Sequence, residues 1–469
     1  MKRMAVPRSE EPRPRAGFPG VAPRGQADSG SAPEDGATPA PERTGFRYLL
    51  GQRDFQLIWY AQVGAQLADK FLMFSLIILA YHLSKGSTPV AITLLAYTVP
   101  AVGIAPLAGV LADRFDRKTI MVTTNVVRAL LVMLIPLASL VPALRNDYVH
   151  LLVITFAFAA VGQLFSPAEA AAIPSVVSRE SLITANSMVL ATMVVTLVAG
   201  GVLAPVVSRL DIYAPYWLAA TLFTIAGGLI WFARIPRPET GPTTPEEKRH
   251  PFHQVAVELK EGFAALATSP VLLLSFYELT LAVLVMFMMF TLAPAYVSQV
   301  LGIEAQDSYV ILLPATVGAL IAAAALGQLG RKISPPTLLV TALAATGLTL
   351  VLLATAPAVL LQFEELRAYA RWAGSAFSLL LGLEFGALLI PALTYLMENT
   401  TDSTRGRVFA LLFMVVNGVT AVPVLLTAVL SDWFGINHVI GALGVLVAGT
   451  GVFMARYARR VFATARQPG

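Results

Sequence analysis

Long apolar runs recur along the whole chain and constrain its fold more than any other feature. Each run is close to the roughly 20 residues that a helix needs to cross the hydrocarbon core of a bilayer. The sequence therefore predicts an all-α membrane protein. Twelve spans are expected, at about residues 55–82, 88–112, 119–141, 149–172, 184–208, 213–233, 271–300, 308–330, 337–361, 374–397, 408–430 and 438–458.

The composition agrees with this class and excludes several functions. The chain is 56% hydrophobic and 13% charged, about half the charged fraction of an ordinary soluble domain. Its basic residues are scattered among short loops, which argues against a nucleic-acid partner despite the net charge of +5. With no cysteine and five dispersed histidines, thiol chemistry is excluded and a zinc site is disfavoured. We expect neither a cofactor nor a bound metal.

The regions between the spans divide the chain into five parts. Residues 1–44 are rich in Pro, Gly, Ala and Arg, lack the apolar segment of a signal peptide and are expected to be a disordered basic tail. Two six-helix halves follow, at 45–233 and 269–458, with a linker at 234–268 between them and a short tail at 459–469. The linker begins Pro-rich and then becomes amphipathic, which predicts a helix on the membrane surface.

The distribution of basic residues predicts the orientation. If both termini are cytoplasmic, 26 of the 33 Lys and Arg residues fall in cytoplasmic segments and 5 in outside loops. Cytoplasmic loops of membrane proteins carry such an excess. We therefore expect a multi-pass protein of the plasma (inner) membrane with both termini and the linker in the cytoplasm.

A short charged loop at residues 109–118 joins the second and third expected spans. It resembles the loop between helices 2 and 3 of the major facilitator superfamily, whose pattern is roughly Gly-x-x-x-Asp-Arg-x-Gly-Arg-Lys. The matching residues are Gly109, Asp113, Arg114, Arg117 and Lys118. Asp116 stands where the family usually has Gly, and we expect it to adopt the left-handed backbone that Asp tolerates better than most residues.

The two halves of the chain echo each other, as the halves of this superfamily do. Pro167-Ala168 and Pro391-Ala392 lie at equivalent places near the ends of two spans, 224 residues apart. The segment Gly327–Lys332 is similar to an eroded copy of the charged loop. Such internal duplication is typical of this transporter fold, in which the halves are pseudo-symmetric.

Further segments resemble the enterobactin-exporter and macrolide-efflux branch of the superfamily. They are Asp54–Trp59 with Gln66–Asp69, Ser166–Ala168 with Ile173–Glu180 and Ala185–Ser187, and Arg405–Leu411. The resemblance implies a secondary transporter that works by alternating access, and it leaves the substrate open. It also implies a gate, in which Asp113 caps the start of the eleventh span near Arg405 and Arg407. An acidic side chain at a helix N-terminus contributes roughly 0.3–1 kcal/mol.

Polar residues within the first span form one candidate site. An ionisable group at mid-bilayer costs at least about 2.5–3.5 kcal/mol, so each one present is a functional candidate. On a helix, Gln62, Gln66, Asp69 and Lys70 share one stripe about 100° wide. We expect this stripe to face the bundle interior or a water-filled cleft. The alternative is a purely structural Asp69–Lys70 ion pair.

Three more charged residues fall within spans. Glu384, flanked by Gly382 and Gly386, supplies a carboxylate from the second half at a depth similar to that of Asp69. A carboxylate in a poorly hydrated cavity can exchange protons near neutral pH, and we expect Glu384 to be the proton carrier. Glu278 either has a function or snorkels to the interface. We expect Arg128 to pair with an acidic group near the cytoplasmic gate rather than with substrate.

The seventh span carries Met286, Met288 and Met289 beside Phe287 and Phe290. Flexible thioethers next to aromatic rings suit a cavity that accepts varied apolar molecules. Lipid-facing filler is the interpretation that we favour for these five residues.

The expected function follows from these features. The chain has no Gly-x-x-x-x-Gly-Lys-Ser/Thr string for nucleotide phosphates and no grouping of catalytic residues, so we expect a gradient-driven transporter and no enzyme. Proton-coupled efflux of a hydrophobic or amphipathic small molecule, by a monomer in the bilayer, is the main interpretation. Uptake or facilitated transport of a metabolite is the alternative, followed by a non-transporting protein that reuses the fold.

Overall fold

The structure is a computed structural model, and the chain divides into two units. The structure describes residues 45–104, 115–145, 147–236, 270–329, 335–398 and 420–464, and a few isolated residues between these ranges. The first unit, Met1–Glu42, lies outside the described residues, and the second, Arg43–Gly469, contains all of them. The expected disordered tail and almost all of the expected linker helix therefore also lie outside the described part.

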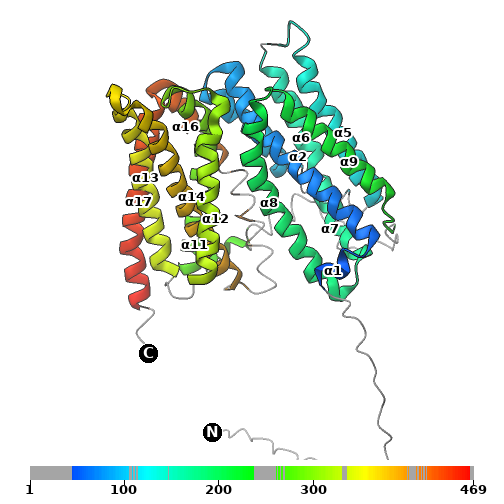
Figure 1. The fold of residues 1–469 in the computed structure, drawn as a ribbon. Coiled ribbons are helices and arrows are strands. Elements are labelled where there is room, and N and C mark those ends of the chain that lie inside the picture. The colour runs from blue at the N-terminus through cyan, green and yellow to red at the C-terminus, as the bar shows by residue number, and fades with distance from the viewer. Residues whose placement is uncertain are drawn as a thin grey trace, which may run out of the picture. The chain divides into compact units, whose positions relative to one another are not determined.

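The described residues form helices and no strand, which confirms the all-α class (Figure 1). Within the described ranges, ten helical segments are long and apolar enough to cross a membrane, and two shorter apolar helices, α3 and α16, accompany them. This number is consistent with twelve spans. The helices are α1 (Phe46–Leu49), α2 (Arg53–Ser84), α3 (Ser87–Gly103), α5 (Arg117–Ala138), α6 (Val149–Gly162), α7 (Phe165–Val176), α8 (Leu182–Ser208), α9 (Ala214–Phe232), α11 (Pro270–Gln299), α12 (Tyr309–Leu329), α13 (Pro335–Leu360), α14 (Arg367–Glu398), α16 (Ala421–Phe434) and α17 (Ile436–Thr464).

The fourth expected span, 149–172, is interrupted. It consists of α6 and α7, which are separated at Gln163 and Leu164. Pro167 stands in the first turn of α7, where its missing N–H leaves the carbonyl of Gln163 without its usual helical donor. The proline therefore explains where the helix breaks.

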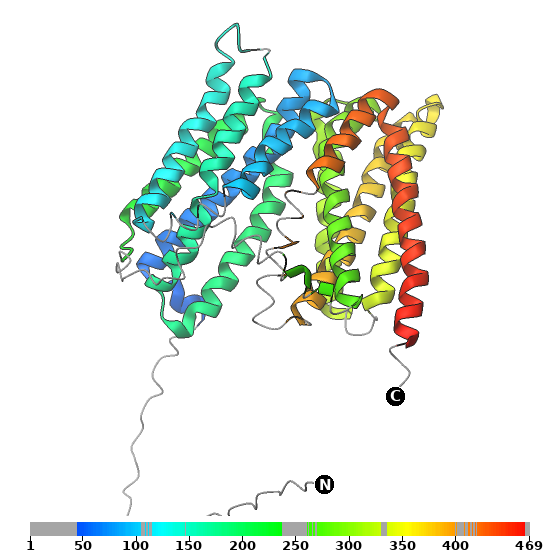
Figure 2. The same cartoon turned by 180° about the vertical axis from the view of Figure 1, so that it is seen from behind.

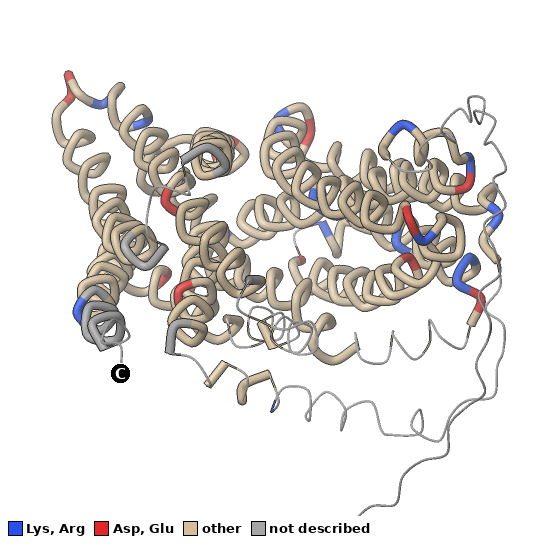
Figure 3. Tube along the Cα trace, turned by 90° about the horizontal axis from the view of Figure 1, so that it is seen from below, with Lys and Arg blue, Asp and Glu red and all other residues tan. Residues whose placement is uncertain are grey.

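The helices pack into two groups (Figures 1 and 2). In the first group, α2 contacts α3, α8 and α9, while α5 contacts α6 and α9. In the second group, α14 contacts α11, α12 and α13, and α13 also contacts α17. Figure 3 shows how few charged residues interrupt these helices. The fold thus buries apolar faces of neighbouring helices against one another, as expected of a membrane bundle.

Small residues bring α12 and α14 close together. A Cβ added at Gly382 would overlap the carbonyl of Ala315, and one added at Gly318 would overlap the carbonyl of Leu379. Close approach of two backbones through small residues is how helices commonly pack in membranes, where no hydrophobic force drives their association.

The two groups make polar contacts at one end, the upper end in Figure 1, which we call the closed end. Asp432 at the end of α16 accepts hydrogen bonds from the backbone N–H groups of Ser87 (2.7 Å) and Thr88 (2.8 Å) in α3. Gly86, the N-cap residue of α3, supplies no side-chain cap. The second group therefore satisfies the N-terminus of a helix in the first, where a carboxylate is favoured by the helix dipole.

A second set of contacts reinforces the closed end. Arg209, which follows α8, forms an ion pair with Asp307 (3.0 Å) and donates to the hydroxyl of Tyr309 (3.0 Å). Below these contacts, Met288 of α11 packs with residues of α3 and α16, such as Leu94 and Val424. The two groups are thus joined at this end by charge and by apolar packing.

Candidate functional site

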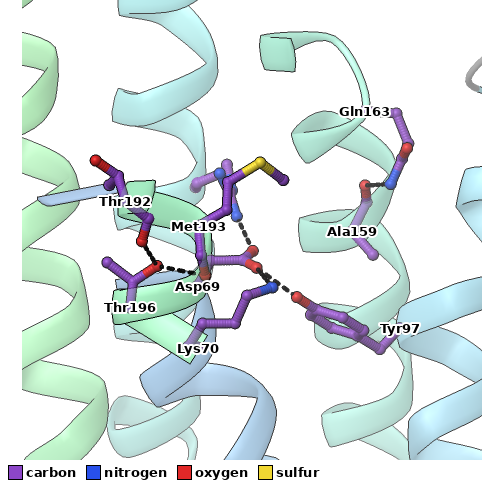
Figure 4. A network of polar contacts seen from close by, with 9 residues as sticks. Asp69, Lys70, Tyr97, Ala159, Gln163, Thr192, Met193 and Thr196 are labelled. Atoms are coloured by element: carbon purple, nitrogen blue, oxygen red, sulfur yellow. Dashed lines mark hydrogen bonds and ion pairs between the residues drawn. The ribbon is translucent and has the colours of Figure 1, made fainter. Parts of the chain in front are cut away.

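A buried cluster of charged side chains centres on Asp69, near the middle of α2 (Figure 4). One carboxylate oxygen accepts from the ammonium of Lys70 (3.0 Å) and from the hydroxyl of Tyr97 in α3 (2.6 Å). The other accepts from the guanidinium of Arg128 in α5. Three helices of the first group therefore meet at this one carboxylate.

Arg128 is held in place by aromatic rings as well as by Asp69. Its guanidinium carbon lies 4.3 Å from the ring centres of both Phe158 in α6 and Phe223 in α9. Gly162 lies next to it, and the side chain of Arg128 is only 6% exposed. Cation–π contacts of this kind are strongest where water is excluded. Arg128 therefore pairs with an acidic group, as expected, but this group lies in the middle of α2.

The predicted polar stripe of α2 divides into two parts. Gln62 is 1% exposed, and its amide lies 3.5 Å from the carbonyl of Val189 in α8. One turn later, Gln66 is half-buried, as are Asp69 and Lys70. Gln62 thus lies in the α2–α8 contact. The backbone of Lys70 also packs on α8, at Gly200, while its ammonium and the carboxylate of Asp69 belong to the charged cluster.

The second group contributes two buried carboxylates. Glu384 in α14 accepts a hydrogen bond from Thr349 in α13 (2.7 Å), and its second oxygen has no partner among the described residues. Glu278 in α11 is fully buried, and neither of its oxygens has a described partner. Snorkelling of Glu278 to the interface is therefore wrong. No described contact joins either residue to Asp69.

A cavity of about 190 Å³ lies between the two groups. The first group contributes Phe74 of α2 and Leu197 and Val198 of α8. From the second group, side chains of α11 to α14 and of α17 line it, and its few polar contributors include Thr346 and Ser378. The cavity can therefore hold a mainly apolar molecule.

The methionine-rich part of α11 faces this cavity and the core. Met286, Met289 and Phe290 line the cavity, Met288 is 5% exposed, and Phe287 is half-buried. The interpretation of these residues as lipid-facing filler is therefore wrong. Single-sequence hydropathy missed this because lipid-facing and cavity-facing apolar residues have the same composition.

Most of the expected gate lies outside the described residues, including Gly109, Asp113, Arg114, Arg405 and Arg407. Of the remaining gate residues, Arg117 donates to the carbonyl of Ala171 (2.9 Å), and the ammonium of Lys118 lies 5.9 Å from the ring centre of Trp231. Both contacts stay within the first group.

The left-handed backbone expected at Asp116 is wrong. Its φ is −60° and its ψ is 118°. It is the N-cap of α5 and accepts from the backbone N–H (3.2 Å) and the hydroxyl (2.6 Å) of Thr119. N-cap residues require an extended backbone, and this capping role explains Asp at the position where the family pattern has Gly.

Three polar residues were missed by the sequence analysis. Glu169 in α7 is 6% exposed, and one of its oxygens lacks a described partner. It falls within an expected span, so the cost of burying a charge would have identified it. Tyr97 and Asp432 act on partners in distant helices, and no local pattern announces those contacts.

In the part of the chain that the structure describes, no three His, Asp or Glu side chains lie close enough to hold a metal ion. The geometry instead offers charged and hydrogen-bonding groups around an apolar cavity, and a set of contacts that closes one end of the bundle.

Comparison with known proteins identifies the architecture. Residues 58–422 match the family described as the Major Facilitator Superfamily. A curated relative, the "Uncharacterized MFS-type transporter YfiS" of Bacillus subtilis (strain 168), is 24% identical over 409 residues, which cover 86% of this chain and 92% of the relative.

Solved structures share the fold at low sequence identity. A bacterial homologue of the human lysosomal transporter Spinster, in an inward-facing and unoccupied conformation, has a TM-score of 0.66 and 12% identity, covering 90% of this chain and all of that chain. The nucleoside transporter NupG (D323A mutant) has a TM-score of 0.63 and 10% identity, covering 87% of this chain and all of that one.

Proposed function

Because this chain belongs to the major facilitator superfamily and is a membrane transporter rather than an enzyme, we propose that it exports a hydrophobic or amphipathic small molecule in exchange for protons. In this proposal it works by alternating access, with residues 45–233 and 269–458 as the moving halves. It acts as a monomer in the plasma membrane, with both termini in the cytoplasm.

The observation that carries the proposal is the apolar cavity between the two groups, beside contacts that close one end. A transporter that alternates needs a central site and a gate that breaks in each cycle. Asp432 on the N-terminus of α3 is a gate of suitable strength, since a side-chain cap contributes about 0.5–2 kcal/mol. Such a contact can bias one state and still open.

The charged loop offers the opposite gate. We propose that Asp113, at the far end of the second span, caps the start of the eleventh span near Arg405 and Arg407. At the closed end the same two spans are joined the other way round: Asp432, at the end of the eleventh span, caps the start of the second span. Each carboxylate would stabilise one of the two states.

Coupling is assigned to Glu384. Asp69 already accepts from three donors, two of them cationic, whereas Glu384 accepts from the neutral hydroxyl of Thr349 and its second oxygen has no described partner. A buried carboxylate with no cationic partner gains and loses a proton more readily than one held between two cations. In this scheme the Asp69 cluster responds to substrate, and Glu384 carries the proton.

The test uses inverted membrane vesicles from cells that express the protein, suspended in the small-molecule extract of those cells. Mass spectrometry then measures what accumulates inside when a proton gradient is imposed. Export predicts compounds that accumulate with the wild type and are lost with Asp113→Asn, while Glu384→Gln still binds them but no longer responds to the gradient. Equal contents in wild-type and Asp113→Asn vesicles would refute the proposal.

Right-side-out vesicles from the same cells address the alternative of metabolite uptake. Under that alternative, compounds accumulate in the right-side-out vesicles and not in the inverted ones. If vesicles with Glu384→Gln still concentrate substrate when only a proton gradient is supplied, Glu384 is not the coupling residue.

A further inference from the structure

The Asp69 cluster contains more positive than negative charge. Lys70 and Arg128 both bond to the single carboxylate of Asp69. Among the described residues, no second carboxylate pairs with either cation, and α6, α8 and α9, which surround the cluster, contain no Asp or Glu. Glu169 of α7 is buried in the same group, but no described ion pair joins it to Lys70 or Arg128. Within the cluster itself, one positive charge therefore has no anionic partner of its own. Burying a charge in this way is costly unless a partner completes it.

The two cations differ in how easily a ligand can reach them. Arg128 is enclosed by two aromatic rings and is 6% exposed, while the side chain of Lys70 is 22% exposed. An ammonium has three donors, and in the described contacts Lys70 uses one of them on Asp69. Asp69 already accepts hydrogen bonds from three donors, two of them cationic. Lys70 can therefore bind an anion, whereas a cation at Asp69 would compete with two cations already bound there.

Lys70 lies one helical turn from the apolar cavity, although it is not itself a lining residue. Phe74, four residues later on α2 and on the same helix face, lines the cavity. Across from Lys70, a Cβ added at Gly200 of α8 would overlap its Cβ, and Leu197, three residues earlier on α8, lines the cavity. The cation thus neighbours residues of a chamber whose lining is mainly apolar.

We propose that the substrate is an amphipathic organic anion, with its apolar body in the cavity and its carboxylate, sulfate or phosphate group on the ammonium of Lys70. This inference rests on the proposed transport function and specifies its substrate class. The two cations that already pair with Asp69 argue against a cationic substrate at this position, because they would repel it. A neutral apolar molecule would leave the excess charge of the cluster uncompensated.

Three probes with the same bicyclic body test the proposal, since that body suits a cavity of about 190 Å³. They are naphthylacetate, naphthylacetamide and naphthylethylammonium, which are anionic, neutral and cationic. Equilibrium binding is measured to the full-length protein in lipid nanodiscs, without any gradient. We expect naphthylacetate to bind at least about ten-fold more tightly than naphthylacetamide and naphthylethylammonium. A difference of this size is what one hydrogen bond between charged groups contributes to binding.

Variants then assign the preference to one residue. Lys70→Gln is expected to weaken binding of naphthylacetate by about ten-fold or more and to leave the amide unchanged. Lys70→Arg should keep most of the preference. The matched control is Lys85→Asn. Lys85 is exposed and follows α2, and Asn tolerates the left-handed backbone at this position, so the substitution removes only a positive charge.

Equal binding of the three probes, tighter binding of the ammonium compound, or a preference that survives Lys70→Gln would each overturn the inference. Failure of the wild type to bind naphthylacetate would do the same. Because the assay needs no transport, a charge preference in a protein that moves nothing across vesicles would retain the anion site and reject the transport function.

Discussion

Arg128 depends on Asp69 for its only described anionic partner, and two aromatic rings lie against its guanidinium. Asp69→Asn would leave Arg128 buried beside Lys70 without a negative charge. Removing one partner of a buried ion pair costs about 3–5 kcal/mol. We expect the Asp69→Asn protein in nanodiscs to unfold at a clearly lower temperature than the wild type. Adding Arg128→Met should restore part of the lost unfolding temperature.

The control for this substitution is Asp147→Asn. Asp147 is 41% exposed and accepts a hydrogen bond from the N–H of Val149, a role that Asn also fills. We expect an unchanged unfolding temperature for this variant. If Asp69→Asn unfolds at the wild-type temperature as well, Asp69 does not hold Arg128 in the folded protein.

The sequence predicted part of this cluster and not the rest. The helical stripe correctly placed Asp69 and Lys70 on one side of α2, because periodicity within one helix is a local property. Tyr97, Phe158 and Phe223 come from three other helices, and their convergence depends on packing that no local pattern encodes. The same limit explains why the partner of Arg128 was expected near the gate.

At the scale of elements, the contact between α12 and α14 depends on Gly382. A side chain there would meet the carbonyl of Ala315, and overpacking a close contact costs about 1–3 kcal/mol. We expect Gly382→Ala to lower the unfolding temperature. Gly228→Ala in α9 is the matched control, because nothing lies within 4 Å of its added Cβ. That change should be neutral or stabilising by up to about 1 kcal/mol. Equal effects of the two substitutions would argue against tight α12–α14 packing.

Element positions were the most predictable part of the fold. Runs of about 20 apolar residues gave helix positions because a bilayer requires that length. Two boundaries were missed. The break at Gln163 comes from a proline, which hardly changes the hydropathy of the run, and α14 begins at Arg367, before its apolar run does. The orientation of the Met-rich face of α11 was also missed, because it depends on the neighbouring group.

For the whole molecule, the proposed orientation predicts the side on which each segment is accessible. The native chain has no cysteine, so a single Thr240→Cys variant carries the only thiol. An impermeant maleimide should label it in inverted vesicles and leave it unlabelled in intact cells. Leu210→Cys, an exposed position at the closed end, should show the opposite pattern. Labelling of position 240 in intact cells would reverse the topology.

Alternation between two states is the central claim, and the distance across the closed end tests it most directly. Spin labels at Leu210→Cys in the first group and Glu304→Cys in the second, both exposed, report this distance. The account predicts a short and a longer population, with the longer-to-short ratio raised about 2- to 30-fold by Asp432→Ala, the range expected for losing a helix cap. Asp211→Ala, which loses a side-chain hydrogen bond to the backbone N–H of Tyr213 within its own group, should leave the ratio unchanged. A single distance that is the same in the wild type and in Asp432→Ala would contradict the account.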